Sequence, residues 1–143
     1  NVFQKNNSNF KKSRNIENKI MLLGVANVWN DRKGYSDFLK LSNSLPDKYV
    51  IVLVGLNEKQ MQNLPKNIIG IQKTENVEQL VAIYNDADYF LNLTYEDTYP
   101  TTNLEAKACG TPVISYSTGG SVESADIIVD KGNYNEVLKY IGE

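Results

Sequence analysis

The sequence predicts an α/β domain with a doubly wound parallel sheet of about six strands and helices on both faces. Two observations support this fold class. Short apolar runs of strand length alternate with amphipathic segments of helix length from Lys19 to the end of the chain. The apolar runs have the length of buried strands and end at polar or turn residues. Strands that are joined through helices pair in parallel by right-handed crossovers.

The first half of this pattern contains three predicted strands. A loop from Ala26 to Gly34 follows the first of them, and a helix with Phe38, Leu41 and Leu45 on one face ends before Pro46. A short helix from 59 to 64 separates the second strand from the third. The three predicted strands span residues 20–25, 49–55 and 68–71.

The second half repeats the alternation. A helix begins at Asn76, with Gln79 as its capping-box partner, and another begins at about Thr102. A final helix follows from Asn133. The predicted strands between these helices span residues 88–93, 112–116 and 127–129.

Length and composition suit one globular domain. The chain has 143 residues, of which 41% are hydrophobic and 22% charged, and no apolar run approaches the roughly 20 residues of a membrane span. Its single cysteine, Cys109, cannot form an internal disulfide, and no signal-peptide pattern is visible. We therefore expect a cytoplasmic setting.

The beginning of the chain differs from the rest in charge and pattern. Residues 1–33 carry seven Lys or Arg against two acids, whereas the remainder carries eight against fifteen. A solvated lysine-rich tail explains this asymmetry, so nucleic-acid binding gains little support. Because residues 1–18 are polar and lack periodicity, we expect 1–18 to be a linker or the tail of a missing amino-terminal domain, and 19–143 to be the folded domain.

The segment from Tyr95 to Ile114 is the strongest indication of function. It places two carboxylates, Asp97 and Glu105, on either side of a predicted helix N-terminus, where free backbone N–H groups can hold a phosphate. Carboxylates beside such a terminus can accept hydrogen bonds from sugar hydroxyls, a combination that suits a nucleotide-sugar. Two alternatives need no ligand: Thr102 and Glu105 form a capping box, and Asp97 bonds its own turn.

The segment from Glu96 to Ile114, followed by Thr118-Gly119-Gly120, resembles the carboxyl-terminal donor-binding domain of family-4 retaining glycosyltransferases. The resemblance covers nearly all of residues 19–140 and rests on an acid-x7-acid motif followed by Glu-Ala-x-Ala-Cys-Gly-Thr-Pro-Val-Ile. It implies a Rossmann-like half of a two-domain enzyme of the B-type glycosyltransferase fold. By this likeness Asp97 contacts the donor sugar, Glu105 holds the ribose, and backbone amides between them face the sugar and diphosphate.

The motif departs from the family at two positions. Asp97 stands where glutamate is most frequent, and the neighbouring Glu96 could compensate for the shorter side chain. Pro100 stands where glycine is frequent and lacks a backbone N–H that could face the donor. The hydroxyls of Thr101 and Thr102 could replace that donor group. The resemblance also includes Asn103 in the donor-binding set.

The loop before Gly34 supplies the second part of the predicted site. Lys33 matches the Lys-Gly element of the family, and the resemblance implies that it pairs with the diphosphate and stabilises the leaving group, acting with Asp97 in catalysis. A plain surface Arg-Lys pair is the alternative. Val28 stands where the family often has an arginine, so we include Arg32 as its substitute. We expect Trp29 to pack on its neighbours.

These residues predict retaining transfer of a hexose from a nucleotide-diphosphate sugar to a saccharide or lipid-linked acceptor, in surface-polysaccharide synthesis. A UDP-sugar is favoured and GDP-mannose stays open. The chain contains no histidine and no clustered cysteines, so we expect no cofactor and no metal. The missing amino-terminal domain would bind the acceptor and provide any membrane contact, at the inner face of the membrane. This chain alone would bind donor without turnover.

Two alternative functions stay open. One is a nucleotide-binding α/β module without catalysis, which would bind nucleotide whatever the sugar. The other is a nucleotide-sugar epimerase of the same fold, although the absence of histidine argues against the extra acid or base that it would need. A dinucleotide oxidoreductase is less favoured, because no Gly-x-Gly-x-x-Gly follows the first strand.

Overall fold

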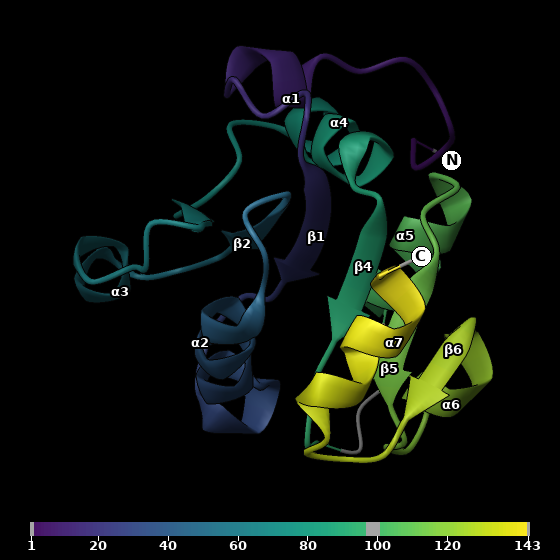
Figure 1. The fold of residues 1–143 in the computed structure, drawn as a ribbon. Helices are drawn as coiled ribbons and strands as arrows, with labels where there is room; N and C mark the ends of the chain where they lie inside the picture. Colours follow the sequence, from purple (N-terminus) through teal and green to yellow (C-terminus); the bar gives the residue numbers. More distant parts are fainter. Residues whose placement is uncertain (1, 97–100, 143) are drawn as a thin grey trace.

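A six-stranded parallel sheet forms the centre of the described part of the chain, which comprises residues 2–96 and 101–142 of a computed structural model (Figure 1). The strand order is β3-β2-β1-β4-β5-β6, so the chain builds one half outward from β1 and then returns to build the other half outward from β4. The strands are β1 (Ile20–Val25), β2 (Tyr49–Val54), β3 (Ile68–Ile71), β4 (Tyr89–Asn92), β5 (Val113–Tyr116) and β6 (Ile127–Val129).

Helices occupy every connection between strands, and further helices precede β1 and follow β6. The α-helices are α1 (Phe10–Ser13), α2 (Tyr35–Ser44), α3 (Glu58–Gln62), α4 (Val77–Asp86), α5 (Thr101–Ala108), α6 (Ser121–Ser124) and α7 (Val137–Ile141), and two 3-10 turns, η1 (Asp31–Lys33) and η2 (Tyr134–Glu136), precede α2 and α7. The predicted fold class is confirmed, and each predicted strand lies within one residue of its observed bounds. In the described ranges, no helix combines the length and apolar character needed to span a membrane.

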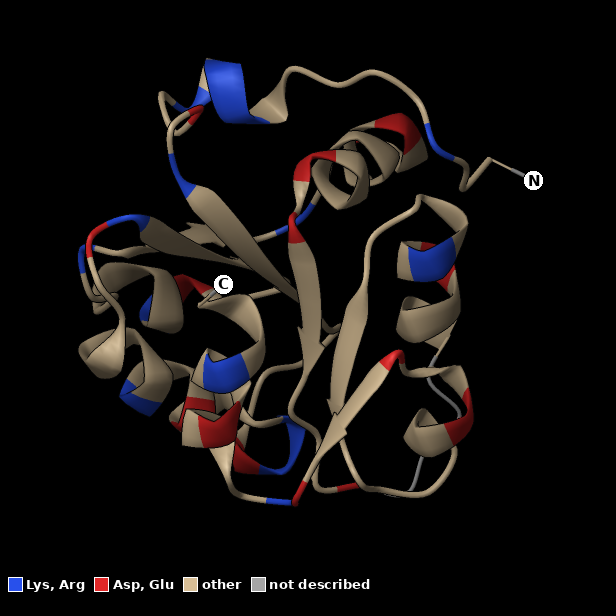
Figure 2. Ribbon diagram, turned by 45° about the vertical axis from the view of Figure 1, so that its right-hand side comes forward, with Lys and Arg blue, Asp and Glu red and all other residues tan. Residues whose placement is uncertain are grey.

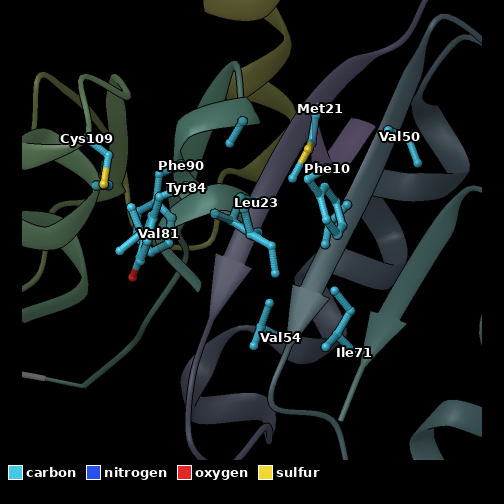
Figure 3. Packing of buried hydrophobic residues seen from close by; sticks show 14 of the residues in the cluster. Phe10, Met21, Leu23, Val50, Val54, Ile71, Val81, Tyr84, Phe90 and Cys109 are labelled. Carbon is cyan, nitrogen blue, oxygen red and sulfur yellow. The ribbon is translucent and has the colours of Figure 1, made fainter. Parts of the chain in front are cut away.

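The sheet is buried on both faces by two hydrophobic clusters. Alternate residues of β1 separate into them: Met21 and Leu23 pack with Tyr84 of α4 on one face, and Leu22 packs with Phe38 of α2 on the other. Figure 3 shows the first cluster, to which α1, α4 and α5 contribute. Because both faces are covered, the strands are continuous apolar runs, and Lys, Arg, Asp and Glu lie on helices and loops (Figure 2).

Asparagine side chains cap the beginnings of α3 and α4. Asn76 caps α4 by accepting from the Gln79 backbone N–H at 2.9 Å, as predicted, but the Gln79 side chain accepts from Glu75 N at 2.6 Å instead of from the cap residue. The reciprocal capping box occurs in α3, where Asn57 and Gln60 each accept from the backbone N–H of the other.

The amino-terminal segment packs on the domain. We predicted that residues 1–18 form a linker or tail outside the folded domain, but α1 lies in this segment, and Phe10 and Ile16 are buried in the first cluster. Asn6 N donates to Asn85 Oδ1 of α4 at 2.7 Å, and Figure 1 shows the segment passing close to α4. Isolated apolar residues in an asparagine-rich stretch give no periodic pattern, so the sequence did not reveal this packing.

Candidate functional site

A cleft of about 730 Å³ opens at the carboxyl ends of β1 and β4, where the two halves of the sheet diverge. Parallel sheets bind ligands at this topological switch point because the loops on the two sides leave in opposite directions. The walls come from the loop after β1, the end of β4 and the first turns of α5. The predicted site residues in the lining are Arg32, Lys33, Glu96, Thr101, Thr102 and Glu105.

The loop after β1 presents two basic side chains to the cleft. Asn30 caps the 3-10 turn η1 by accepting from Lys33 N at 3.1 Å, and Gly34 follows with φ of 87°. A Cβ at Gly34 would lie 2.2 Å from the Leu93 carbonyl oxygen, so a side chain here would strike the end of β4. Glycine therefore permits the close approach that brings Lys33 into the cleft.

Hydrogen bonds to backbone carbonyl oxygens join this loop to the segment after β4. The Arg32 carbonyl oxygen accepts from Tyr95 N at 2.7 Å and from Thr94 Oγ1 at 3.2 Å. The Thr94 carbonyl oxygen in turn accepts from Thr118 Oγ1 at 3.2 Å. Three loops that follow different strands are thus connected at one end of the sheet.

Glu96 pairs with both basic residues of the loop. Its Oε2 lies 3.1 Å from Lys33 Nζ, and its Oε1 lies 3.3 Å from Arg32 Nε. The Arg32 side chain is 75% exposed, whereas the Lys33 side chain is 33% exposed. Lys33 is therefore the more enclosed cation, and an anion in the cleft would meet it beside the Glu96 carboxylate.

Glu105 comes from the second turn of α5 and has a partner on another helix. Its Oε1 accepts from the Tyr84 hydroxyl at 2.9 Å. Burial, reinforced by the Glu105 carboxylate, raises the pKa of Tyr84 above its usual value, so this phenol remains a donor at neutral pH. The capping-box alternative for Glu105 is wrong, because α5 begins at Thr101 and Thr102 lies inside the helix.

Asn103 does not line the cleft. Its side chain is fully buried, its Oδ1 accepts from Asn92 Nδ2 at 3.0 Å, and its Nδ2 donates to Ser124 Oγ at 3.0 Å. The structure therefore gives this side chain a role in joining β4, α5 and α6, in place of the donor contact that the motif predicts. Asp97, the other predicted acid, lies outside the described residues, as does Pro100.

Trp29 packs as predicted. Its Nε1 donates to the Val54 carbonyl oxygen at 2.9 Å, and its ring meets Phe38 edge to face with centroids 5.3 Å apart. Val28 lies at the cleft and is 65% exposed. An apolar side chain thus occupies the position where the family often has an arginine.

The chain contains one Asp-x-Asp pair, Asp86-Ala87-Asp88, which the sequence reading overlooked. Asp86 Oδ2 accepts from Lys11 N at 2.8 Å, and Asp88 Oδ2 accepts from Met21 N at 2.8 Å and from Lys11 Nζ at 2.7 Å. The two carboxylates thus join the end of α4 and the start of β4 to α1 and β1. Neither lines the cleft. Across residues 2–96 and 101–142, no three Asp, Glu or Cys residues gather as a metal site would require.

A buried acid of α2 connects the segment after β4 to the end of β5. Asp37, in the first turn of α2, accepts from the hydroxyl of Tyr95 and, at 2.6 Å, from that of Tyr116 at the end of β5. Burial, together with the Asp37 carboxylate, raises the pKa of Tyr95 to about 12. Two phenols therefore satisfy one carboxylate that is only 6% exposed.

Sequence reasoning missed other residues at the site. Asn92, the last residue of β4, and Thr94, just beyond it, line the cleft, and their place at the carboxyl end of a buried strand could have indicated them. Leu80 lines it from α4, while Tyr84 reaches Glu105 from the same helix. Leu80 and Tyr84 lie at a helical spacing typical of core positions, and nothing local distinguishes a core tyrosine from one whose hydroxyl reaches a site.

Comparison with known proteins identifies the family of the chain. The sequence model described as "Glycosyl transferases group 1" matches residues 5–139. The alpha-galactosylglucosyldiacylglycerol synthase of Streptococcus pneumoniae is 32% identical over 111 residues, which is 68% of this chain and 29% of that protein. The N,N'-diacetylbacillosaminyl-diphospho-undecaprenol alpha-1,3-N-acetylgalactosaminyltransferase of Campylobacter jejuni is 28% identical over 119 residues, or 80% of this chain and 31% of that protein.

Solved structures share the fold at low sequence identity. A crystal structure of Anabaena HepE in complex with UDP-glucose superposes with a TM-score of 0.83 at 15% identity, covering 99% of this chain and 44% of that one. The carboxyl-terminal domain of a group 1 glycosyl transferase from Francisella tularensis superposes with a TM-score of 0.76 at 15% identity, covering 99% and 84%. This chain spans about a third of the length of the curated relatives described above.

The family model covers almost the whole chain. The membership of a glycosyltransferase family that the acid-x7-acid segment indicated is confirmed. The chain belongs to the group 1 glycosyl transferases.

Proposed function

We propose that this chain is the carboxyl-terminal donor-binding domain of a retaining glycosyltransferase that moves a hexose from a nucleotide-diphosphate sugar to a saccharide or lipid-linked acceptor. One observation carries the proposal: a single cleft presents Arg32 and Lys33 on one wall and the beginning of α5 with Glu105 on another. A nucleotide-sugar needs positive charge for its diphosphate and hydrogen-bond acceptors for its hydroxyls. The cleft contains both.

Lys33 and the first turn of α5 would hold the diphosphate. A helix N-terminus has backbone N–H groups without partners in the helix and a partial positive charge, and Thr101 and Thr102 add hydroxyl donors to the lining. As the bond from the sugar to the diphosphate breaks, negative charge grows on the departing phosphate oxygen. Cations and dipoles already fixed in place stabilise that charge, which is commonly among the largest catalytic terms.

The carboxylates would bind the hydroxyl groups of the donor. Glu105 is assigned to the ribose, and Asp97 and Glu96 to the sugar, following the family resemblance. Glu96 lies in the cleft lining and pairs with Lys33, which supports its assignment to the donor. No metal or cofactor forms part of the proposal, because Lys33, Arg32 and the helix terminus supply the positive charge.

A UDP-sugar is the favoured donor. Support comes from solved structures of similar fold, since Anabaena HepE has been crystallised with UDP-glucose and with UDP. The names of the bacterial relatives, a diacylglycerol glycoside synthase and a transferase acting on a diphospho-undecaprenol, support a lipid-linked or saccharide acceptor. We place the complete enzyme in surface-polysaccharide synthesis, at the cytoplasmic face of the membrane, with an amino-terminal domain that binds the acceptor.

Calorimetric titration with UDP, GDP and their sugars tests the proposal. Lys33→Ala and Glu105→Ala should each weaken UDP binding by roughly 10- to 100-fold, the loss expected for a hydrogen bond with a charged partner. Lys40→Ala and Glu123→Ala are matched controls, because both residues are exposed and neither lines the cleft. Unchanged affinity in both site variants would overturn the assignment.

The titrations also test the alternative of a nucleotide-binding module without catalysis. Tighter binding of a UDP-sugar than of UDP, reduced by Asp97→Ala, is expected of a donor domain. Binding that is indifferent to the sugar and unaffected by Asp97→Ala would instead indicate a nucleotide-binding module without catalysis.

A further inference from the structure

Tyr84 is a core residue whose ring is fixed on several sides. It is fully buried, its ring meets Phe3 edge to face at 5.9 Å and 82°, and the Phe90 ring lies 5.7 Å away (Figure 3). Its carbonyl oxygen also accepts from Thr111 Oγ1 at 2.5 Å. With ring and backbone both held, the hydroxyl can point in essentially one direction.

That direction leads to the functional site. The Tyr84 hydroxyl donates to Glu105 Oε1 at 2.9 Å, from α4 to α5, while Glu105 itself lines the cleft. Tyr84 is absent from the lining, so it reaches a ligand only through Glu105. A carboxylate has two oxygens, and fixing one of them sets the plane of the group and leaves the other to accept from a ligand.

We propose that Tyr84 is a positioning residue that orients the Glu105 carboxylate toward the ribose hydroxyls of the nucleotide donor. The inference rests on the proposed function of Glu105 and adds a residue to it. A glutamate side chain has several rotatable bonds, and ordering it upon binding weakens affinity. The Tyr84 bond orders it before the ligand arrives, and a bond from a hydroxyl to a charged acceptor is among the stronger kinds.

The protonation of Tyr84 suits this role. Burial and the neighbouring carboxylate raise the pKa of its phenol, so the hydroxyl keeps its proton wherever Glu105 is ionised and the protein is at neutral pH. The Tyr84 hydroxyl is therefore the donor of this bond at neutral pH.

Tyr84→Phe separates positioning from packing, because it removes the hydroxyl and keeps the ring. The probes are UDP and its 2′,3′-dideoxy analogue (the deoxy analogue), which lacks both ribose hydroxyls, titrated by calorimetry against the full chain. The wild type should prefer UDP, and Tyr84→Phe should weaken UDP binding by about 3- to 10-fold while changing binding of the deoxy analogue by less than about twofold. In the Glu105→Ala background, Tyr84→Phe should have no further effect.

Tyr49→Phe is the matched control. Tyr49 is also buried, and its hydroxyl donates to the Ile141 carbonyl oxygen at 2.8 Å on the opposite face of the sheet. Both substitutions should lower thermal stability, but only Tyr84→Phe should narrow the preference for UDP over the deoxy analogue. Tyr84→Leu, which also lacks the hydroxyl, is a second variant. It is judged by the ratio of the affinity for UDP to the affinity for the deoxy analogue.

Two outcomes distinguish failure of this inference from failure of the proposed function. If Glu105→Ala weakens UDP binding and Tyr84→Phe keeps the wild-type ratio, Tyr84 does not position Glu105 and the donor site stands. If Glu105→Ala leaves UDP binding unchanged, the ribose assignment itself is wrong and the role of Tyr84 is overturned with it.

Discussion

Lys33 Nζ lies 3.1 Å from Glu96 Oε2, so the lysine that we propose for the diphosphate is already paired with an acid. The same carboxylate lies 3.3 Å from Arg32 Nε through its other oxygen. One glutamate thus spans both cations of the loop at the mouth of the cleft. A diphosphate that reaches Lys33 must compete with this internal anion.

Glu96→Gln should therefore strengthen binding of UDP. Removing the carboxylate frees Lys33 and removes a negative charge that repels the diphosphate. The pair is partly exposed, so its energy lies within about 1 kcal/mol, equivalent to an affinity gain of about two- to fivefold. Calorimetric titration of UDP measures the change.

Glu75→Gln is the control, since Glu75 is exposed and does not line the cleft. The extra affinity gained by adding glucose to UDP should become smaller in Glu96→Gln if Glu96 contacts the sugar as predicted. A loss of UDP affinity would contradict competition and would show that Glu96 instead holds Lys33 in its binding position.

Gly34→Ala should destabilise the domain strongly. Gly34 has a φ of 87°, and a Cβ there would lie 2.2 Å from the Leu93 carbonyl oxygen, an atom of a strand end that cannot move aside. The left-handed backbone costs alanine about 1–2 kcal/mol, and the clash should bring the total to about 3 kcal/mol or more. Urea denaturation measures the free energy of unfolding.

Gly110→Ala separates the cost of the steric clash from the cost of the left-handed backbone conformation. Gly110 has a similar φ of 81°, but a Cβ there would meet only the flexible Lys5 side chain, at 3.3 Å. It should cost only the conformational part, about 1–2 kcal/mol. Equal losses in the two variants would show that Leu93 yields and that close approach is not the reason for glycine at position 34.

Asn103→Ala should lower stability with little effect on donor affinity. The substitution leaves Asn92 and Ser124 without the partners that they have in the interior, and the cost of such unsatisfied groups is about 1–3 kcal/mol. Denaturation and UDP titration of the same variant measure both quantities. Asn63→Ala, at an exposed asparagine, is the control. A large loss of affinity at unchanged stability would restore the donor contact that the motif predicts.

The fold followed from local patterns because each strand is buried on both faces. Runs such as 20–25 and 49–54 must then be wholly apolar, and this signal survives without knowledge of their neighbours. Lys33 and Gly34 were also recognisable, because a basic residue and a glycine after the first strand match the family's motif. The amino-terminal segment was not recognised, since the burial of Phe10 depends on contacts with distant α4 and β strands.

Partners from distant segments explain the errors at the site. Local sequence offered Glu105 a capping partner at Thr102, but its partner in the structure, Tyr84, is 21 residues away. Likewise the motif assigned Asn103 to the donor, whereas Asn92 and Ser124 on other elements occupy its amide. A polar side chain in a helix can form hydrogen bonds with groups of other elements that pack against the helix. A local motif carries no information on these partners.

Asp37 and its two tyrosines predict a loss of stability at alkaline pH. The pKa of Tyr95 rises from its usual value near 10 to about 12, first because of burial and then because its hydroxyl donates to Asp37. Burial also raises the pKa of Tyr116. Between about pH 10 and about pH 12 the unfolded chain releases the Tyr95 proton while the folded chain keeps it. The contribution of Tyr95 to the free energy of unfolding is therefore fully present below about pH 10 and is lost as pH increases through this window.

Tyr95→Phe isolates the contribution of one phenol to this slope. The variant should be less stable than the wild type at neutral pH, because Asp37 keeps only the Tyr116 hydroxyl, and its stability should fall less steeply above about pH 10. Urea denaturation from about pH 9 to about pH 11.5 measures both effects. Tyr140→Phe, at an exposed tyrosine of α7, controls for the loss of a surface phenol and should keep the wild-type slope. If Tyr95→Phe also keeps that slope, the Tyr95 proton is held no more tightly in the folded chain than in the unfolded one, and the bond to Asp37 does not link the segment after β4 to α2 in solution.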